Sequence, residues 1–411
     1  MTTGTSEPEA AAPLKHRLLQ GVPRRVILLI LVMAVNNFGF SYLSIVLVAF
    51  LPEVGVSGVV VGFILGAEGL SMATFSIPFG ILSDRRGRKW ILILGSMGAA
   101  PVFFMISLTL NPILLVLAGI IGGMMEGTYL STVNALIADQ TPLESRTSAF
   151  AASFVIAGSG STLGSAVPFF IPSLASLLSA SVVSVHIAIL LLFGFISLVT
   201  PVSLFLILRD YHEVPKPSGG IWKGKTTANM LKFAGVNSLI GLGAGFIIPL
   251  IPLWLLLRYS IPDTYSGPIL AISGLTIGLA AIFSPRLAKR LGLINAIILT
   301  EGLSLAFMVA IPYTANPVTA CSLYVVRAML MNMSSPLGDS FLMGIVTPEE
   351  RGFASSLNAV IWRIPNSITT IFGAAILWSG NYVLPFLLAG GFYAVAIPLY
   401  YVFFRKMKPV S

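Results

Sequence analysis

Residues 80–89 read GILSDRRGRK and form a charged turn between two long apolar runs. Charge is scarce elsewhere, since 9% of the 411 residues are charged and 56% are hydrophobic. With a mean hydropathy of +0.94, a soluble domain of this length would lack enough polar surface. The chain is therefore expected to be an integral membrane protein.

Helices are expected to make the crossings, because the apolar runs are long and continuous, whereas barrel strands alternate over about ten residues. A helix crosses a hydrocarbon core of roughly 30 Å with about 20 residues. Twelve runs between charged residues and Pro, Gly or Asn breaks meet this length. They lie near residues 25–50, 57–82, 89–110, 112–138, 147–171, 184–208, 228–257, 264–284, 292–312, 317–346, 352–378 and 381–404.

The basic residues of the chain are distributed asymmetrically about these spans. With twelve spans both termini fall on one side, and 21 of the 24 Lys and Arg residues lie in segments on that side. Arg258 alone falls in an opposite loop, and Arg327 and Arg363 fall within spans. Because basic loops stay in the cytoplasm, we expect a multi-pass protein of the cell membrane with both termini cytoplasmic. The net charge of +9 is then explained by topology and by anionic lipids, not by nucleic-acid binding.

The charged loops repeat weakly at an offset of 205 residues. Arg85 and Gly87 correspond to Arg290 and Gly292, since 290 − 85 and 292 − 87 both equal 205. A hydrophilic linker rich in Pro and Gly separates the two halves. The expected organisation is a cytoplasmic tail 1–24, a six-helix bundle 25–208, a cytoplasmic linker 209–227, a six-helix bundle 228–404 and a cytoplasmic tail 405–411.

The turn at residues 80–89 resembles the most diagnostic motif of the major facilitator superfamily, G-x-L-x-D-R-x-G-R-K. The matching residues are Gly80, Leu82, Asp84, Arg85, Gly87, Arg88 and Lys89. A degenerate copy follows at residues 284–292. The resemblance implies an all-α membrane fold of twelve helices in two pseudo-symmetric six-helix bundles. It also implies a secondary transporter that alternates access to a central cavity, lined by spans 1, 4, 7 and 10, with spans 2, 5, 8 and 11 beside it.

The motif is expected to act as a gate. Gly80 and Gly87 permit close helix approach and a tight turn, while Asp84 lies at the inner end of the second span. A carboxylate there can pair with an Arg or accept hydrogen bonds from a helix N-terminus, and so latch the outward-open state. The alternative is that Arg85, Arg88 and Lys89 only set the topology and that Asp84 is solvated.

Ionisable residues within the spans are the candidates for the transport site, because charge in hydrocarbon is unfavourable and commonly functional. They are Glu68, Glu126, Glu301, Arg327, Asp339 and Arg363. Glu126 and Glu68 are expected to bind substrate or a coupling proton, since burial favours the neutral carboxyl; structural pairing is the alternative. Arg327 and Arg363 are expected to bind an anion or to form salt bridges, in the case of Arg363 within its own half.

Polar and proline residues complete the expected cavity. Asn36 and Asn37 in the first span are expected to present amides to a ligand or to hydrogen-bond between helices. Bends are predicted at Pro249 and Pro252 in the seventh span and at Pro336 in the tenth. His186, near the outer end of the sixth span, is given no functional role.

The chain is not expected to be an enzyme, because it has no Gly-rich phosphate loop, no His/Cys metal spacing and no nucleophile motif. No cofactor or metal is expected, and a proton gradient is the expected driving force. The predicted function is proton-coupled efflux of a small organic compound by a monomer in contact with membrane lipids. In pattern the chain is nearest to drug and proton antiporters of the superfamily, although it lacks their span 4 arginine near residues 121–123. Two alternatives remain: an organic-anion transporter for uptake, by symport or facilitated diffusion through Arg327 and Arg363, and a non-transporting membrane receptor.

Overall fold

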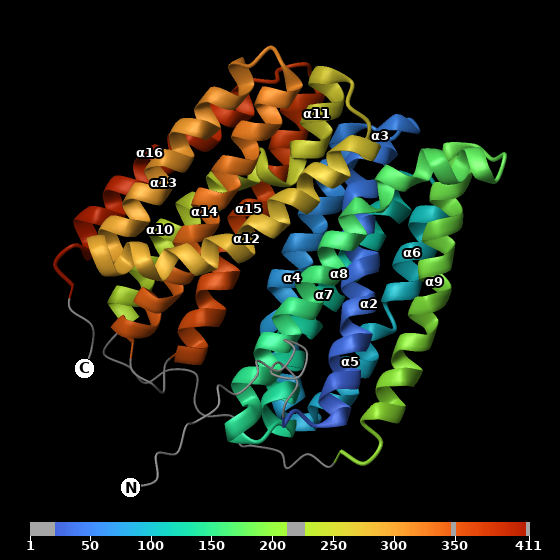
Figure 1. Cartoon of the computed structure of the whole chain (residues 1–411), viewed down its shortest axis with the longest axis horizontal. Coiled ribbons are helices and arrows are strands. Elements are labelled where there is room, and N and C mark those ends of the chain that lie inside the picture. The colour runs from blue at the N-terminus through green and yellow to red at the C-terminus, as the bar shows by residue number, and fades with distance from the viewer. Residues whose placement is uncertain (1–20, 212–226, 347–350, 408–411) are drawn as a thin grey trace, which may run out of the picture.

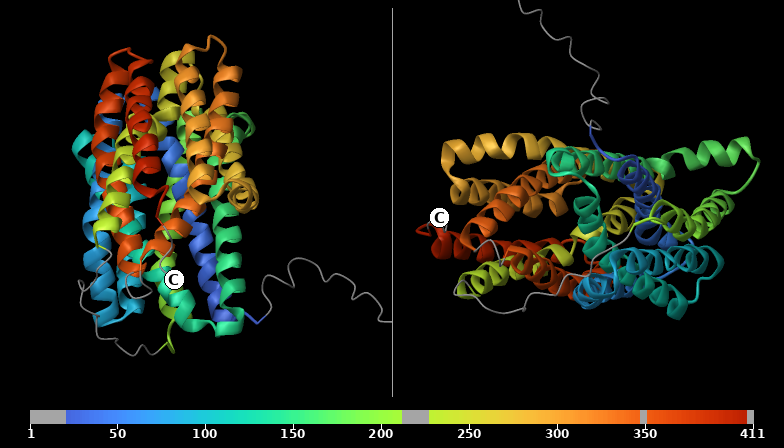
Figure 2. Two further views of the ribbon diagram at one scale, coloured as in Figure 1. Left: turned by 90° about the vertical axis from the view of Figure 1, so that its left-hand side faces the viewer. Right: turned by 90° about the horizontal axis from the view of Figure 1, so that it is seen from below.

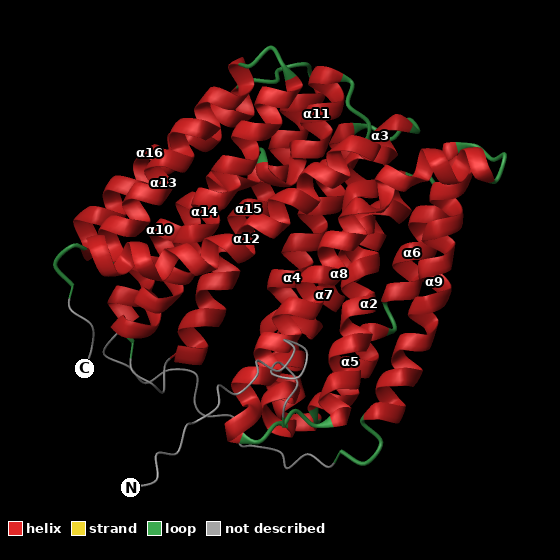
Figure 3. Ribbon diagram, viewed as in Figure 1, coloured by secondary structure: helices red, strands yellow, loops and turns green. Residues whose placement is uncertain are grey.

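The computed structural model describes residues 21–211, 227–346 and 351–407. Helices dominate these residues, and no strand occurs in the described ranges (Figure 3). The predicted N-terminal tail lies almost wholly outside the described residues, as does most of the predicted linker.

The described part of the first half, from residue 21 on, forms eight α-helices and one π-helical turn. These are α2 (Arg24–Ile45), the π-helix Val46–Phe50, α3 (Leu51–Glu53), α4 (Gly58–Arg86), α5 (Arg88–Ser96), α6 (Ala99–Leu108), α7 (Pro112–Gln140), α8 (Leu143–Leu177) and α9 (Val182–Ile207).

In the second half, residues 227–346 and 351–407 form seven α-helices and two short 3-10 helices. These are α10 (Thr227–Gly245), the 3-10 helix Ile248–Leu250, α11 (Ile251–Tyr259), α12 (Asp263–Leu291), α13 (Leu293–Ala310), the 3-10 helix Ile311–Tyr313, α14 (Pro317–Ile345), α15 (Arg351–Trp378) and α16 (Leu384–Phe404).

Ten helical segments of the described chain are long and apolar enough to cross a membrane. Helices α12 and α14 fall at the expected eighth and tenth spans but are not among the ten. Each has 29 residues, enough for a core of roughly 30 Å, and α14 carries Arg327 and Asp339, which lower its hydropathy. The all-helical membrane fold is thus confirmed, while the count of twelve spans stays a prediction.

The 205-residue offset predicted from the loops recurs in the helix boundaries. Helices α4 and α12 each have 29 residues, and 263 − 58 and 291 − 86 both equal 205. Helices α7 and α14 also have 29 residues each, and 317 − 112 and 345 − 140 equal 205 as well. The two halves therefore repeat one arrangement of helices.

The same offset relates the turns that end α4 and α12. Gly87 has φ 102° and Gly292 has φ 81°, a region that favours glycine. The Gly87 N–H donates to the Ser83 carbonyl at 3.0 Å, and the Gly292 N–H donates to the Ala288 carbonyl at 2.9 Å. The glycine of the charged turn is therefore needed to end the helix.

The helix boundaries test one of the two predicted bends. The seventh span is broken, since α10 ends at Gly245 and a 3-10 helix precedes α11. Pro249 and Pro252 occupy the first turns of the two segments that follow the break, where a missing N–H is tolerated. Pro336 lies inside α14, which continues through it without interruption.

The helices gather into two groups that follow the halves of the chain. Figure 1 shows α2–α9 on one side and α10–α16 on the other, and Figure 2 shows the same division from below. The groups touch chiefly where α4 packs on α15 and α8 packs on α12. Their ribbons converge near α3 and α11 and diverge toward the start of α2 and the end of α9 (Figure 1). We call these the closed end and the divergent end.

Helix α4 lies between α7 of its own half and α15 of the other. A Cβ at Gly66 of α4 would lie 2.5 Å from Cγ1 of Ile371 on α15. A Cβ at Gly123 of α7 would lie 2.0 Å from the Glu68 carbonyl oxygen on α4. Small residues thus bring the three backbones close together, as they do between membrane helices generally.

Candidate functional site

A cavity of about 470 Å³ lies between the two groups of helices. In the first half its walls come from α2, α4, α5, α7 and α8. In the second half they come from the 3-10 helix Ile248–Leu250 and from α11, α12 and α15. Five of the six residues predicted to contact substrate or a proton line this cavity. They are Asn36, Asn37, Glu68, Glu126 and Arg363.

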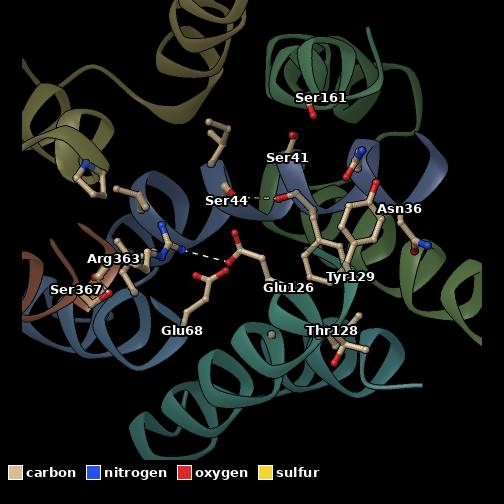
Figure 4. Close-up of a pocket in the computed structure, with 18 of the residues that line it drawn as sticks. Asn36, Ser41, Ser44, Glu68, Glu126, Thr128, Tyr129, Ser161, Arg363 and Ser367 are labelled. Atoms are coloured by element: carbon tan, nitrogen blue, oxygen red, sulfur yellow. Dashed lines mark hydrogen bonds and ion pairs between the residues drawn. The ribbon is translucent and has the colours of Figure 1, made fainter. Parts of the chain in front are cut away.

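An ion pair crosses the cavity from one half to the other. Nη2 of Arg363 on α15 donates to Oε2 of Glu126 on α7 at 3.2 Å (Figure 4). The side chains are 26% and 43% exposed, respectively, so water in the cavity reaches both. The predicted salt bridge of Arg363 within its own half is wrong for this conformation, because its partner belongs to the other half.

Glu68 of α4 lies beside this pair, and its carboxylate points toward that of Glu126 (Figure 4). Close helix packing places it there. A Cβ at the neighbouring Gly69 would lie 2.0 Å from Oγ of Ser367 and 3.0 Å from Nε of Arg363. Two carboxyl groups and one guanidinium therefore meet where α4, α7 and α15 are closest.

The arrangement can hold a positive charge or a proton. Two carboxylates against one guanidinium leave an excess of negative charge on the cavity wall. A cation in the cavity would compete with Arg363 for Glu126, and so would a proton.

Further polar residues of α15 line the cavity beside Arg363, namely Asn366, Ser367 and Thr370. They follow Arg363 at spacings of three, four and seven residues and so share one helix face. This spacing was readable in the sequence, but the prediction relied on charge alone and missed it.

Helix α2 shows the same pattern. Asn37, Ser41 and Ser44 line the cavity at spacings of four and seven residues. Of these residues the prediction named Asn37, with its neighbour Asn36.

Arg327 lies elsewhere, buried in the second half at 4% exposure. Its Nη2 donates to the Tyr393 hydroxyl of α16 at 3.1 Å, and Ser304 of α13 donates to the Arg327 carbonyl at 3.2 Å. It does not line the cavity between the halves. Its contacts join α14 to α13 and α16, so Arg327 contributes to helix packing within the second half.

Glu301 and Asp339 line a second cavity of about 350 Å³, together with Tyr400. Most of its walls belong to helices of the second half. No ion pair joins either carboxylate to Arg327 among the described residues.

The gating motif lies at the divergent end. The side chain of Asp84 lies outside the described residues, so the expected latch is an untested prediction. Arg85 is exposed, and Gly80 and Gly87 bracket the last turns of α4.

Two basic residues of the motif contact their own half. Arg88 forms an ion pair with Asp139 of α7 and donates to the Ala135 carbonyl at 3.4 Å. Lys89 donates to the Arg209 carbonyl at 3.3 Å. In this conformation the described side-chain contacts of Arg88 and Lys89 therefore lie within the first half.

Comparison with known proteins yields a family match across the chain. The family model of the Major Facilitator Superfamily matches residues 29–331 and 233–411. The chain is 26% identical over 325 residues to the multidrug resistance protein MdtG of Proteus mirabilis, covering 75% of this chain and 77% of that protein. It is 31% identical over 132 residues to the quinolone resistance protein NorA of Staphylococcus aureus, covering 32% of this chain and 34% of that protein.

Among solved structures, the crystal structure of an auto-inhibited peptide transporter of the POT family is similar in fold. Its TM-score is 0.76 at 15% sequence identity, covering 95% of this chain and 98% of that chain. At that identity the likeness concerns the fold alone.

Proposed function

The chain belongs to the Major Facilitator Superfamily, and we propose that it exports an amphipathic organic cation in exchange for protons. The family makes it a multi-pass membrane transporter of a small-molecule substrate and not an enzyme. Efflux, proton coupling and the charge of the substrate are the parts that we propose.

The observation that carries the proposal is the Glu126–Arg363 ion pair in the cavity, at 3.2 Å. Both side chains are partly exposed, and a pair in such a setting contributes little stability. A proton on Glu126 would release Arg363, and a cationic substrate could replace it. One carboxyl group that holds either a proton or a substrate, but not both, is what exchange requires.

The other walls suit an amphipathic molecule. Phe40, Val48, Leu65 and Met125 supply apolar surface, and a methionine adapts to ligands of different shape. The names of the two similar proteins, one for multidrug and one for quinolone resistance, support export of organic compounds.

The direction follows from the proposed topology. If the basic loops lie in the cytoplasm, the divergent end faces the cytoplasm, and the structure is the inward-facing conformation. The substrate would enter the cavity from there and leave after the halves rock apart at the closed end. We place the protein in the cell membrane as a monomer.

Of the two arginines that the organic-anion alternative would use, one lines the cavity. Arg363 is 26% exposed on its side chain and lines the cavity, so it could bind a carboxylate or sulfonate in place of Glu126. Arg327 does not line the cavity, which weakens this alternative.

Proteoliposomes test the proposal. We expect an imposed pH gradient to drive tetraphenylphosphonium transport by the wild type and by Glu144→Gln, which changes an exposed carboxylate of α8 outside the cavity. Glu126→Gln should lower this flux at least about tenfold, because it removes the titratable group.

Three results would contradict the proposed export of a cation in exchange for protons. Flux of an anionic fluorescein probe that is lost in Arg363→Ala would establish the anion alternative. Gradient-driven cation flux that is unchanged in Glu126→Gln would refute the role of Glu126. No flux of either probe by folded wild-type protein would count against transport of both classes.

A further inference from the structure

A second ion pair joins the two halves at the closed end. Nε2 of His186, near the start of α9, lies 3.2 Å from Oδ2 of Asp263, the first residue of α12. The side chains are 0% and 1% exposed. Neither atom forms a hydrogen bond with a described residue, its neighbour in this contact included, so the attraction between them requires a protonated imidazole.

Two groups of the first half contact the imidazole, and a third holds the start of α12. The Tyr42 hydroxyl of α2 lies 2.8 Å from Nδ1 of His186, and the Phe50 ring stacks on the imidazole with centroids 3.9 Å apart. Glu53 of α3 accepts a hydrogen bond from the Asp263 N–H at 3.1 Å. The titratable groups that face His186 from the described elements are therefore Tyr42, Glu53 and Asp263.

The charge balance of this cluster depends on one proton. With a neutral imidazole, the buried carboxylate of Asp263 would lack the one cation that contacts it among the described residues, whereas Glu53 beside it is exposed to solvent. Buried charge is unfavourable unless it is paired. The imidazolium supplies the pairing, and its Nδ1–H then donates to the Tyr42 hydroxyl. In the neutral tautomer without a hydrogen on Nδ1, the hydroxyl donates instead.

We propose that His186 is a proton-binding site whose occupancy locks the two halves together at the closed end. The inference rests on the alternating access proposed above and adds a second site for protons, separate from Glu126. When the halves separate at this end, both side chains become exposed to water. The protonated imidazole then loses its contact with Asp263.

Because the closed form holds the proton, lowering the pH favours closure at this end and raising it favours opening there. In the proposed topology this end faces outside, so the proton binds from and returns to the exterior. It acts as a sensor of external pH and is not one of the exchanged protons.

A distance measurement that needs no substrate tests the lock. Spin labels at Ala180→Cys and Ser379→Cys, both exposed loop positions at the closed end, report separation of the halves in the full chain with Cys321→Ala. We expect the ratio of open to closed protein to rise about tenfold between about pH 5.5 and pH 8, because the closed form holds the proton.

Variants identify the group that responds. His186→Gln and Asp263→Asn should raise the open fraction at about pH 5.5 and abolish the pH response. Tyr42→Phe should retain it because the charge pair remains, and so should His16→Gln with His212→Gln, which change the other two histidines of the chain.

A wild type whose distances do not change with pH, or a His186→Gln variant with the wild-type response, would overturn the inference. Failure of the flux experiments leaves this readout intact. Loss of the lock and loss of the proposed function can therefore be distinguished.

Discussion

Two ion pairs join the halves of this transporter, and they differ in their access to water. Glu126 and Arg363 are 43% and 26% exposed on their side chains, whereas Asp263 and His186 are 1% and 0% exposed, although both pairs have a separation of 3.2 Å. A solvated pair is weak and can be exchanged for a ligand. A buried pair contributes through the penalty for breaking it. The first arrangement suits a binding site and the second suits a lock.

The largest effect should come from leaving one buried charge without its partner. His186→Ala removes the cation beside Asp263 and the stacking on Phe50, and should lower the stability of the closed conformation by about 3–5 kcal/mol. Thermal unfolding in detergent at about pH 5.5, where histidine is charged, measures the loss.

A compensated variant separates charge from packing. His186→Leu with Asp263→Leu leaves no buried charge, so it should recover most of that stability. If the double variant is as unstable as His186→Ala, the pair matters for its shape and not for its charge.

The next effect concerns the helix packing that positions the solvated pair. Gly123→Ala would place a Cβ 2.0 Å from the Glu68 carbonyl oxygen, and the backbone must move, with an expected cost of about 1–3 kcal/mol. Gly122→Ala is the matched control, because a Cβ there meets nothing within 4 Å. Equal unfolding midpoints for the two variants would contradict close packing of α7 on α4.

Removing a neutral partner of the buried pair should cost less. Tyr42→Phe deletes one hydrogen bond to the imidazole and should lower stability by about 1 kcal/mol, measured by the same thermal unfolding. A loss as large as that of His186→Ala would mean that Tyr42, and not the charge pair, holds the closed end.

The smallest effect on stability should come from the solvated pair itself. Glu126→Gln should change the free energy of unfolding by less than about 1 kcal/mol, although it should lower gradient-driven flux at least about tenfold. Thermal unfolding and flux of one purified sample measure both. A large loss of stability with normal flux would reverse the roles of the two pairs.

Much of the fold followed from local patterns. The helical membrane architecture and the 205-residue repeat were readable because hydropathy and turn glycines are local signals. The repeat predicted from Arg85 and Gly87 recurs at the ends of α4 and α12. The break near Pro249 was predicted, whereas Pro336 stays within a continuous helix because a membrane helix tolerates proline when its neighbours satisfy the backbone.

The candidate site was predicted in part for the same reason. Charge in an apolar span identified Glu68, Glu126 and Arg363, which the fold brings to one cavity. The same reasoning placed Arg327 in the site, but its guanidinium hydrogen-bonds Tyr393 within the second half. Hydropathy cannot show which face of a helix a charged residue occupies relative to its neighbours.

By itself the sequence determined that the chain spans a membrane, that its halves repeat and which charged residues lie within the spans. Composition, period and spacing carry that information along the chain. Only the tertiary structure decided that Glu126 pairs with Arg363 where both side chains are partly exposed, while His186 contacts Asp263 where both are buried. Partners and burial depend on how α7, α9, α12 and α15 pack across the two halves, and no local pattern records contacts between residues so far apart in the chain.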